Sequence, residues 1–152
     1  MIVHFLLIFI AAACNAVMDT VDHHFNDSIF DNIKDKKKRL WFNSNQGWRN
    51  KYVDRDVKKG RIKWTILGFK FNKPVQITDS WHFFKMLMIF LICMIPALDM
   101  VLMHSNMLIS WNFQYFEISP IYNLFIHWGL LGIVWNLSFF RVFYNYLLLK
   151  KK

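Results

Sequence analysis

Long apolar runs alternate with one long polar stretch along this chain, and that pattern predicts membrane-spanning helices. The apolar runs cover residues 1–18, 81–104 and 121–149. About 20 apolar residues in a helix cross the hydrocarbon core of a bilayer, so each run is long enough, or just long enough, to span it. We therefore expect an all-α membrane protein with about three transmembrane helices.

The polar segments between these runs predict the rest of the organisation. We expect the first helix to continue to about residue 26, and a basic, aromatic loop to occupy residues 27–80. Residues 105–120 are amphipathic and lack Lys and Arg, which predicts a segment lying on the outer membrane surface. Residues 150–152 form a short tail.

The positions of Lys and Arg predict the orientation in the membrane. Residues 34–85 carry fifteen of the nineteen basic side chains, and the tail carries three more. Loops rich in Lys and Arg stay on the cytoplasmic side. We therefore expect a bacterial inner (plasma) membrane protein with its N-terminus outside and its C-terminus inside. The net charge of +9 fits an attraction to anionic lipid headgroups.

A cleaved signal peptide is the alternative interpretation of the first run. Ala11–Cys14 (AAAC) faintly suggests a cleavage or lipoprotein site. However, no positive charge precedes the apolar residues, and cleavage would leave the basic loop on the outer side. We therefore interpret the run as a spanning helix. Gly129 and Gly132 of the third run could let helices approach closely, which allows a homo-oligomer.

Two Asp–His pairs are candidate metal ligands. Asp19 and His23 are four residues apart and Asp79 and His82 are three apart, so each pair shares one helix face. The expected topology places both pairs at the cytoplasmic interface. Carboxylates and imidazoles from neighbouring helices bind Zn, Fe or Mn in helical bundles. A divalent metal there could activate water against a lipid phosphate or ester.

A structural interpretation of the same residues remains open. Asp79 follows Thr78 and could cap the start of the second spanning helix. Asp19 could solvate the end of the first, and His82 could be a polar tip at the interface.

Three basic residues are candidates for binding an anionic ligand: Arg49, Lys51 and Arg141. Arg141 lies inside the third run, near its inner end. It could pair with Asp19 or Asp79, hold a lipid phosphate with two hydrogen bonds, or extend to the headgroups.

A second polar group is expected near the outer surface. It comprises His4, Asp99, His104, Glu117 and His127. Asp99 is the most costly member because it lies within an apolar run. A proton-linked path through this group would need an oligomer, since three helices are too few to enclose a pathway alone.

Other classes of function find little support in the sequence. The basic, aromatic loop could contact nucleic acid, but it contains no known nucleic-acid-binding pattern, and we favour a membrane surface. The two Cys residues lie in apolar runs and make no disulfide framework. Alternation around Arg61–Phe71, with Gly68 as a turn, fits a short strand pair or an interfacial segment, and periodicity does not decide between them.

Three strings of the chain resemble motifs of uncharacterised small membrane proteins of bacteria and their phages. They are NAVMDTVDHHF (Asn15–Phe25), WFNSNQGWRNKY (Trp41–Tyr52) and TDSWHFFK (Thr78–Lys85). The resemblance implies no catalytic roles. It implies that the two Asp–His stripes and the Trp41–Tyr52 segment are to be considered together.

Two functional hypotheses follow. In the first, an integral membrane protein binds or acts on an anionic, lipid-like ligand at a polar site on its inner face, with or without a metal. In the second, a non-enzymatic membrane adaptor docks its basic, aromatic loop on anionic lipid or on a protein partner. The geometry of the four Asp and His side chains would discriminate between them.

Overall fold

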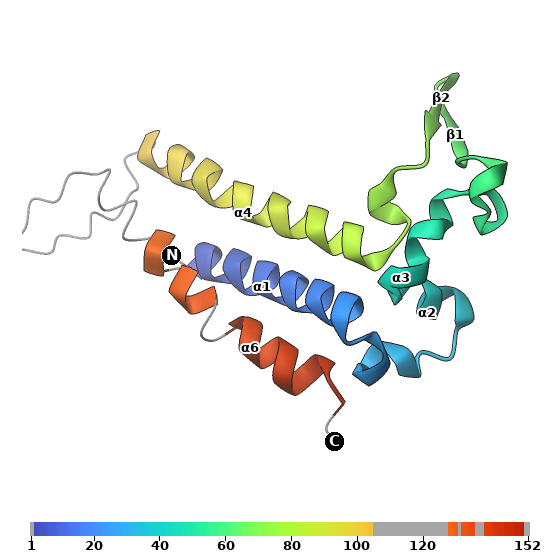
Figure 1. The fold of residues 1–152 in the computed structure, drawn as a ribbon. Coiled ribbons are helices and arrows are strands. Elements are labelled where there is room, and N and C mark those ends of the chain that lie inside the picture. The colour runs from blue at the N-terminus through green and yellow to red at the C-terminus, as the bar shows by residue number, and fades with distance from the viewer. Residues whose placement is uncertain (1, 105–127, 131, 136–138, 151–152) are drawn as a thin grey trace, which may run out of the picture.

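Two long helices lying side by side form the frame of the computed structural model (Figure 1). The structure describes residues 2–104, 128–130, 132–135 and 139–150, with residues 100–104 described by their backbone alone. Helix α1 is Ile2–His23 and helix α4 is Ser80–His104. The two helices run antiparallel, so the end of α1 lies beside the start of α4.

Helices α1 and α4 are both long and apolar enough to cross a membrane. Only 11% of the most apolar window of α4 is buried within the described chain, whereas the core helix of a soluble protein would be mostly buried. Large side chains such as Met86, Ile89 and Phe90 are exposed on it. An uncovered apolar surface of this length fits contact with lipid. The expected class is confirmed to this extent: a mostly helical chain with two helices of membrane length.

Small residues form the face of α1 that packs inward. Ala11, Ala12 and Ala16 are fully buried, and Cys14 is nearly so. Ala11 and Cys14 form one apolar cluster with Leu91 of α4. Small side chains let two helix backbones approach closely, which is a common basis of helix pairing in membranes.

The third expected span falls largely outside the described residues, so the count of three helices is not confirmed. The described part at its C-terminal end comprises α6 (Phe140–Val142) and a π-helix (Phe143–Leu148), which lie along α1. Leu148 packs with Ala16 and Val21. The outer interfacial segment expected at residues 105–120 also lies outside the described residues.

The chain between α1 and α4 gathers at one end of the helix pair (Figure 1). The segment expected as a loop contains short helices and one hairpin. Its α-helices are α2 (Lys36–Phe42) and α3 (Ser44–Gly47). Its 3-10 helices are Phe25–Asp27, Ile29–Asn32, Trp48–Lys51, Val53–Arg55, Val57–Lys59 and Val75–Ile77.

The alternating residues form a strand pair. Strands β1 (Lys63–Ile66) and β2 (Phe69–Asn72) are antiparallel, and Ile66 pairs with Phe69 across a two-residue turn. Both turn residues, Leu67 and Gly68, have positive φ, as a tight hairpin turn of this kind requires.

Candidate functional site at the inner rim

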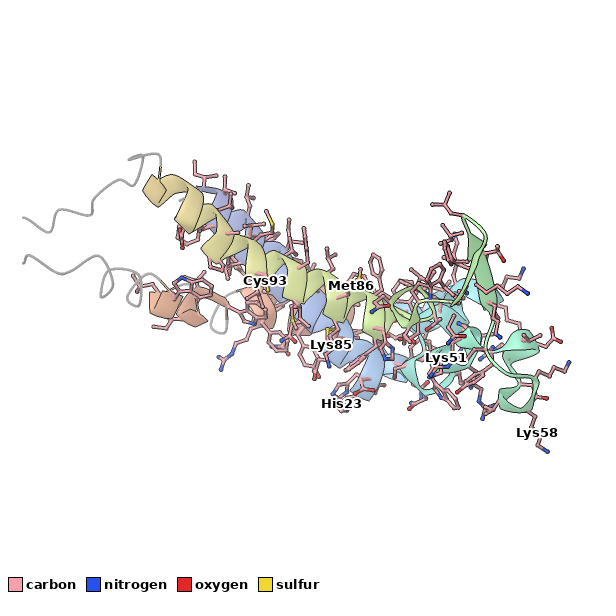
Figure 2. The ribbon with its side chains drawn as sticks, turned by 90° about the horizontal axis from the view of Figure 1, so that it is seen from above. His23, Lys51, Lys58, Lys85, Met86 and Cys93 are labelled. Carbon is pink, nitrogen blue, oxygen red and sulfur yellow. The ribbon has the colours of Figure 1, made fainter. Side chains whose placement is uncertain are left out.

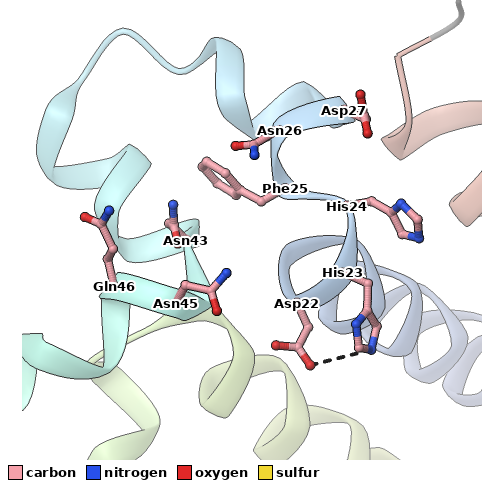
Figure 3. Close-up of a pocket in the computed structure, with 9 residues that line it drawn as sticks. All are labelled: Asp22, His23, His24, Phe25, Asn26, Asp27, Asn43, Asn45 and Gln46. Carbon is pink, nitrogen blue, oxygen red and sulfur yellow. Dashed lines mark ion pairs between the residues drawn. The ribbon is translucent and has the colours of Figure 1, made fainter.

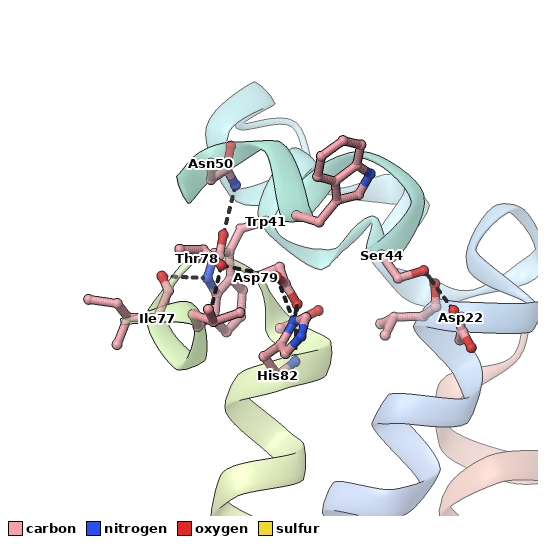
Figure 4. Close-up of polar contacts among 12 residues, drawn as sticks. Asp22, Trp41, Ser44, Asn50, Ile77, Thr78, Asp79 and His82 are labelled. Carbon is pink, nitrogen blue, oxygen red and sulfur yellow. Dashed lines mark hydrogen bonds and ion pairs between the residues drawn. The ribbon is translucent and has the colours of Figure 1, made fainter. Parts of the chain in front are cut away.

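Polar side chains contact one another where α1 ends and α4 begins (Figure 4). We call this region the inner rim, after the side of the membrane on which the sequence predicts it to lie. It consists of Thr20–His23, Trp41–Asn50 and Thr78–His82. The middle segment is the wedge between the two helix ends. Ser44 ties it to α1, because its Oγ donates to the Val21 carbonyl at 2.9 Å and contacts the Asp22 carboxylate at 3.1 Å.

The same segment is tied to the start of α4. The side-chain amide of Asn50 donates to the Thr78 carbonyl at 2.9 Å, and the Ser80 hydroxyl donates to the Phe42 carbonyl at 3.4 Å. Thr78 and Ser80 are fully buried. Buried polar groups are stable only when they have hydrogen-bond partners, so these contacts hold the wedge in one position.

Asp79 is the most completely enclosed charged group of the rim, with 1% of its surface exposed. One carboxylate oxygen accepts the backbone N–H of His82 at 3.0 Å, which caps the first turn of α4. The other accepts the Thr78 hydroxyl at 3.1 Å. The capping role left open in the sequence is therefore present.

Asp79 also fixes the ring of His82. Both carboxylate oxygens lie 2.9 Å from Nδ1 of His82, and 38% of the His82 side chain is exposed. A proton on Nδ1 is shared with the carboxylate, which leaves Nε2 to accept a proton or bind a ligand. A buried carboxylate that orients an accessible imidazole is a common acid–base arrangement in enzymes.

Gly47 provides the space for Asp79. A Cβ placed on Gly47 would lie 2.7 Å from the Cβ of Asp79, and two backbone carbonyls would be almost as close. Any other residue at position 47 would displace the Asp79 side chain or the wedge. The glycine therefore lets the wedge pack directly on the capping residue of α4.

The acidic end of α1 forms a separate group. Nε2 of His23 lies 3.6 Å from the carboxylate of Asp22 and 3.9 Å from that of Asp19. His23 and Asp22 are exposed. On its other side, Asp19 is a hydrogen-bond partner of the Tyr144 hydroxyl.

A polar pocket of about 340 Å³ opens beside this group (Figure 3). Its walls come from the end of α1 and the segment after it, and from the first part of the wedge. The lining residues are Asp22, His23, His24, Phe25, Asn26, Asp27, Asn43, Asn45 and Gln46. The pocket offers carboxylates, imidazoles and amides to a polar ligand.

The four expected metal ligands do not form one group. Asp19 and His23 contact each other on α1, and Asp79 and His82 contact each other on α4. No set of three or more His, Cys, Asp or Glu side chains placed to hold a metal occurs among the residues that the structure describes. Metal binding therefore stays a prediction, to which this geometry adds no support.

The expected anion-binding residues fall into two places. Arg49 and Lys51 both lie over the ring of Trp48, at 5.4 and 5.5 Å from its centroid, and Lys51 also lies over Tyr52. Aromatic faces hold these two cations at the end of the wedge. Arg141 is exposed on α6.

The end of the described chain is clamped to the segment that follows α1. Leu149 forms a β-bridge with Ser28, and the backbone N–H of Lys150 donates to the Asp27 carbonyl at 2.7 Å. The Lys150 ammonium reaches the Asp31 carboxylate at 3.1 Å. This hydrogen bond, and a second cation from Arg39, hold the pKa of Asp31 below its ordinary value. Sequence reasoning missed this clamp, since no local pattern connects the two segments.

At the opposite end of the helix pair, two members of the expected outer group meet. Nε2 of His4 lies 2.8 Å from the Asp99 carboxylate, and both side chains are buried. The contact joins the start of α1 to α4. Glu117 and His127, and the side chain of His104, lie outside what the structure describes.

Comparisons with protein-family models, with curated proteins and with solved structures yield no match for this chain.

Proposed function

We propose that this chain is an integral membrane protein whose inner rim binds an anionic, lipid-like ligand at the cytoplasmic interface. The Asp79–His82 pair carries this proposal. A carboxylate that is 1% exposed is costly to bury, and here its hydrogen bonds hold an imidazole that remains accessible at the end of a membrane-length helix. In this proposal His82 is the acid–base group and Asp79 positions it.

The surrounding cations suit a phosphate or other anionic headgroup. Arg49 and Lys51 supply positive charge next to the wedge, and their aromatic contacts limit their side-chain freedom. Arg141, on the helix that lies along α1, supplies a further cation from the membrane side. Charge-assisted hydrogen bonds from Arg to phosphate are among the strongest polar contacts available.

Binding of short-chain lipids tests the proposal. We expect dioctanoyl phosphatidic acid to bind the purified full chain in neutral detergent at least tenfold more tightly than dioctanoyl phosphatidylcholine, as measured by calorimetry. Lys51→Ala should weaken binding about tenfold, which corresponds to the roughly 1.5 kcal/mol of a charged hydrogen bond. Lys58→Ala is the matched control, because Lys58 lies farther from the helix pair than Lys51 does (Figure 2). Equal affinity for both lipids would contradict the proposal.

Release of inorganic phosphate or fatty acid from the same lipid would distinguish a reaction from binding alone. His82→Ala should then abolish release and leave binding within about threefold.

Elemental analysis of protein produced with added Zn, Fe or Mn tests the metal separately. A metal that serves this site should be present in the wild type and lost in His82→Ala.

A second candidate function is a non-enzymatic membrane adaptor, favoured by the cluster of cations and aromatic rings at Trp48–Tyr52, in which Arg49 is exposed and Trp48, Lys51 and Tyr52 are half-buried. In that case His82→Ala leaves anionic-lipid binding unchanged, no product appears, and the basic substitutions alone weaken binding. Strong salt dependence of binding is expected because the contacts with lipid are between charged groups at the protein surface.

A further inference from the structure

The hairpin β1–β2 has one apolar face and one polar face, and the apolar face is uncovered. Residues paired directly across the strands lie on the same face of the hairpin. Trp64 pairs with Phe71 and Ile66 with Phe69, which makes one face wholly apolar. Lys63 pairs with Asn72 and Thr65 with Lys70, which makes the other face polar and basic.

Every residue of both strands is exposed within the described chain. Phe69 has 69% of its surface exposed and Phe71 has 53%. A two-stranded hairpin with nothing packed on its apolar face is only marginally stable in water. Contiguous exposed apolar side chains mark a surface that contacts something else.

The tip of the hairpin also exposes a large apolar side chain. The first turn residue has φ of 50° and is Leu67, where Asn, Asp or Gly is normally preferred. Leu67 is 92% exposed. A large apolar side chain in a strained and exposed position does not stabilise the protein in water. Its transfer into an apolar phase would lower the free energy.

The position of the hairpin, close to the start of α4, indicates that this apolar phase is the lipid bilayer. Six residues separate Lys73 from Ser80, the first residue of α4, and a chain of that length spans at most about 20 Å. Figure 1 shows the hairpin projecting sideways from the inner end of the helix pair, across the direction of α4. Arg61 and Lys73 flank the strands at the base of the hairpin, and Lys63 and Lys70 lie on the face opposite the apolar one, so the hairpin as a whole is basic.

We infer that this hairpin docks on the anionic surface of the cytoplasmic leaflet, with the face formed by Trp64, Ile66, Phe69 and Phe71 and the Leu67 tip entering the interface. Aromatic side chains suit the headgroup level, and the flanking cations suit anionic headgroups. The inference deepens the proposed function, because a docked hairpin would hold the inner rim against the membrane. It rests on the membrane location of α1 and α4, and not on the chemistry of His82.

Spin labels on adjacent residues test the inference in the full chain. The labels are placed singly at Ile66→Cys on the apolar face and Thr65→Cys on the polar face, in a Cys93→Ala background with the buried Cys14 retained. The protein is reconstituted in discs containing 30% phosphatidylglycerol. Collision with oxygen, which concentrates in lipid, is compared with collision with a water-soluble nickel complex.

We expect the label at position 66 to collide severalfold more often with oxygen than with nickel, and the label at position 65 to show the reverse. Discs of pure phosphatidylcholine should reduce the difference, because they remove the anionic headgroups. Dominant nickel collisions at both positions would overturn the inference. Shielding of position 66 from both reagents would also overturn it, since a protein partner or a second copy would then cover the face.

Binding of dioctanoyl phosphatidic acid to the same labelled variants separates the two proposals. If position 66 lies in water while the lipid still binds, the docking inference fails and the proposed function stands. If position 66 lies in the bilayer while the short-chain lipids bind without discrimination, the proposed function fails and the docking stands.

Discussion

Most of the inner rim and the whole hairpin belong to the same basic stretch of chain, yet the rim buries polar side chains and the hairpin exposes apolar ones. At the rim, polar residues such as Thr78, Asp79 and Ser80 are buried and hydrogen-bonded where the wedge meets the start of α4. On the hairpin, apolar residues such as Phe69 and Phe71 are exposed. The rim is therefore held by the protein itself, whereas the hairpin depends on what lies outside it.

Removal of the Asp79 carboxylate should have the largest effect on stability. Asp79→Ala removes the cap of α4 and leaves the Thr78 hydroxyl and the His82 ring without this partner, so we expect a loss of about 3 kcal/mol in the free energy of unfolding. Denaturation in mixed micelles measures it. Asp54→Ala is the control, because Asp54 is exposed and its pairing with Lys59 is a surface ion pair. Equal losses in the two variants would contradict a structural role for Asp79.

The next largest effect should come from filling the space at Gly47. Gly47→Ala places a Cβ against Asp79, and overpacking of this kind costs about 2 kcal/mol. Gly129→Ala is the matched control, since a Cβ there meets nothing within 4 Å in the described structure. Gly47→Ala should also weaken lipid binding at the rim, because a displaced wedge moves Arg49, one of the proposed anion-binding residues. A variant as stable as Gly129→Ala would show that the wedge does not pack on α4 as described.

Asp79 and Gly47 show which features of the rim the sequence could predict and which it could not. The spacing of Asp79 and His82 predicted their common helix face, and the apolar runs predicted the helices that carry them. The contact of Gly47 with Asp79 and the bond from Ser44 to Asp22 join segments far apart in the chain, and no periodicity encodes such contacts. Sequence reasoning considered Arg141 as a partner of Asp19, which stays a prediction, and it did not find Tyr144, on the next turn, which is a hydrogen-bond partner of Asp19.

The hairpin was easier to predict from the sequence than the rim, because its strand pairing follows from local alternation of apolar and polar residues. Alternation over Arg61–Phe71 and the glycine at position 68 indicated a strand pair, although an interfacial segment fitted equally well. Both descriptions apply if the docking inference is correct, since the strand pair itself would lie at the interface. The exposure of its apolar face depends on the absence of packing from distant segments, which a sequence pattern does not show.

A smaller, pH-dependent effect should appear at the C-terminal clamp. The pKa of Asp31 is lowered by Lys150 and Arg39, so its contribution to stability is present above the ordinary value of 3.8 and is lost as the pH falls through the lowered pKa. Protection of the Lys150 backbone N–H against hydrogen exchange, relative to amides of α1, should therefore persist from neutral pH to about pH 4 and fall below it. Asp31→Asn should lower this protection severalfold at neutral pH and remove the acid transition; unchanged protection would contradict the clamp.

The smallest effect on stability should come from the hairpin face. Phe71→Ser should change the free energy of unfolding in detergent by about 0.5 kcal/mol or less, because Phe71 is 53% exposed within the described chain. The same substitution should nevertheless reduce the oxygen collisions of the label at position 66. A loss comparable to that of Gly47→Ala would mean that the hairpin packs on the rest of the protein.

The central claim is that α1 and α4 cross the membrane and bring the rim to the cytoplasmic face. A single cysteine at Lys58→Cys, in the Cys93→Ala background, tests it with a maleimide that cannot cross membranes. We predict no labelling in intact cells and full labelling once the membrane is opened. Labelling of intact cells would place the basic segment outside and contradict the account.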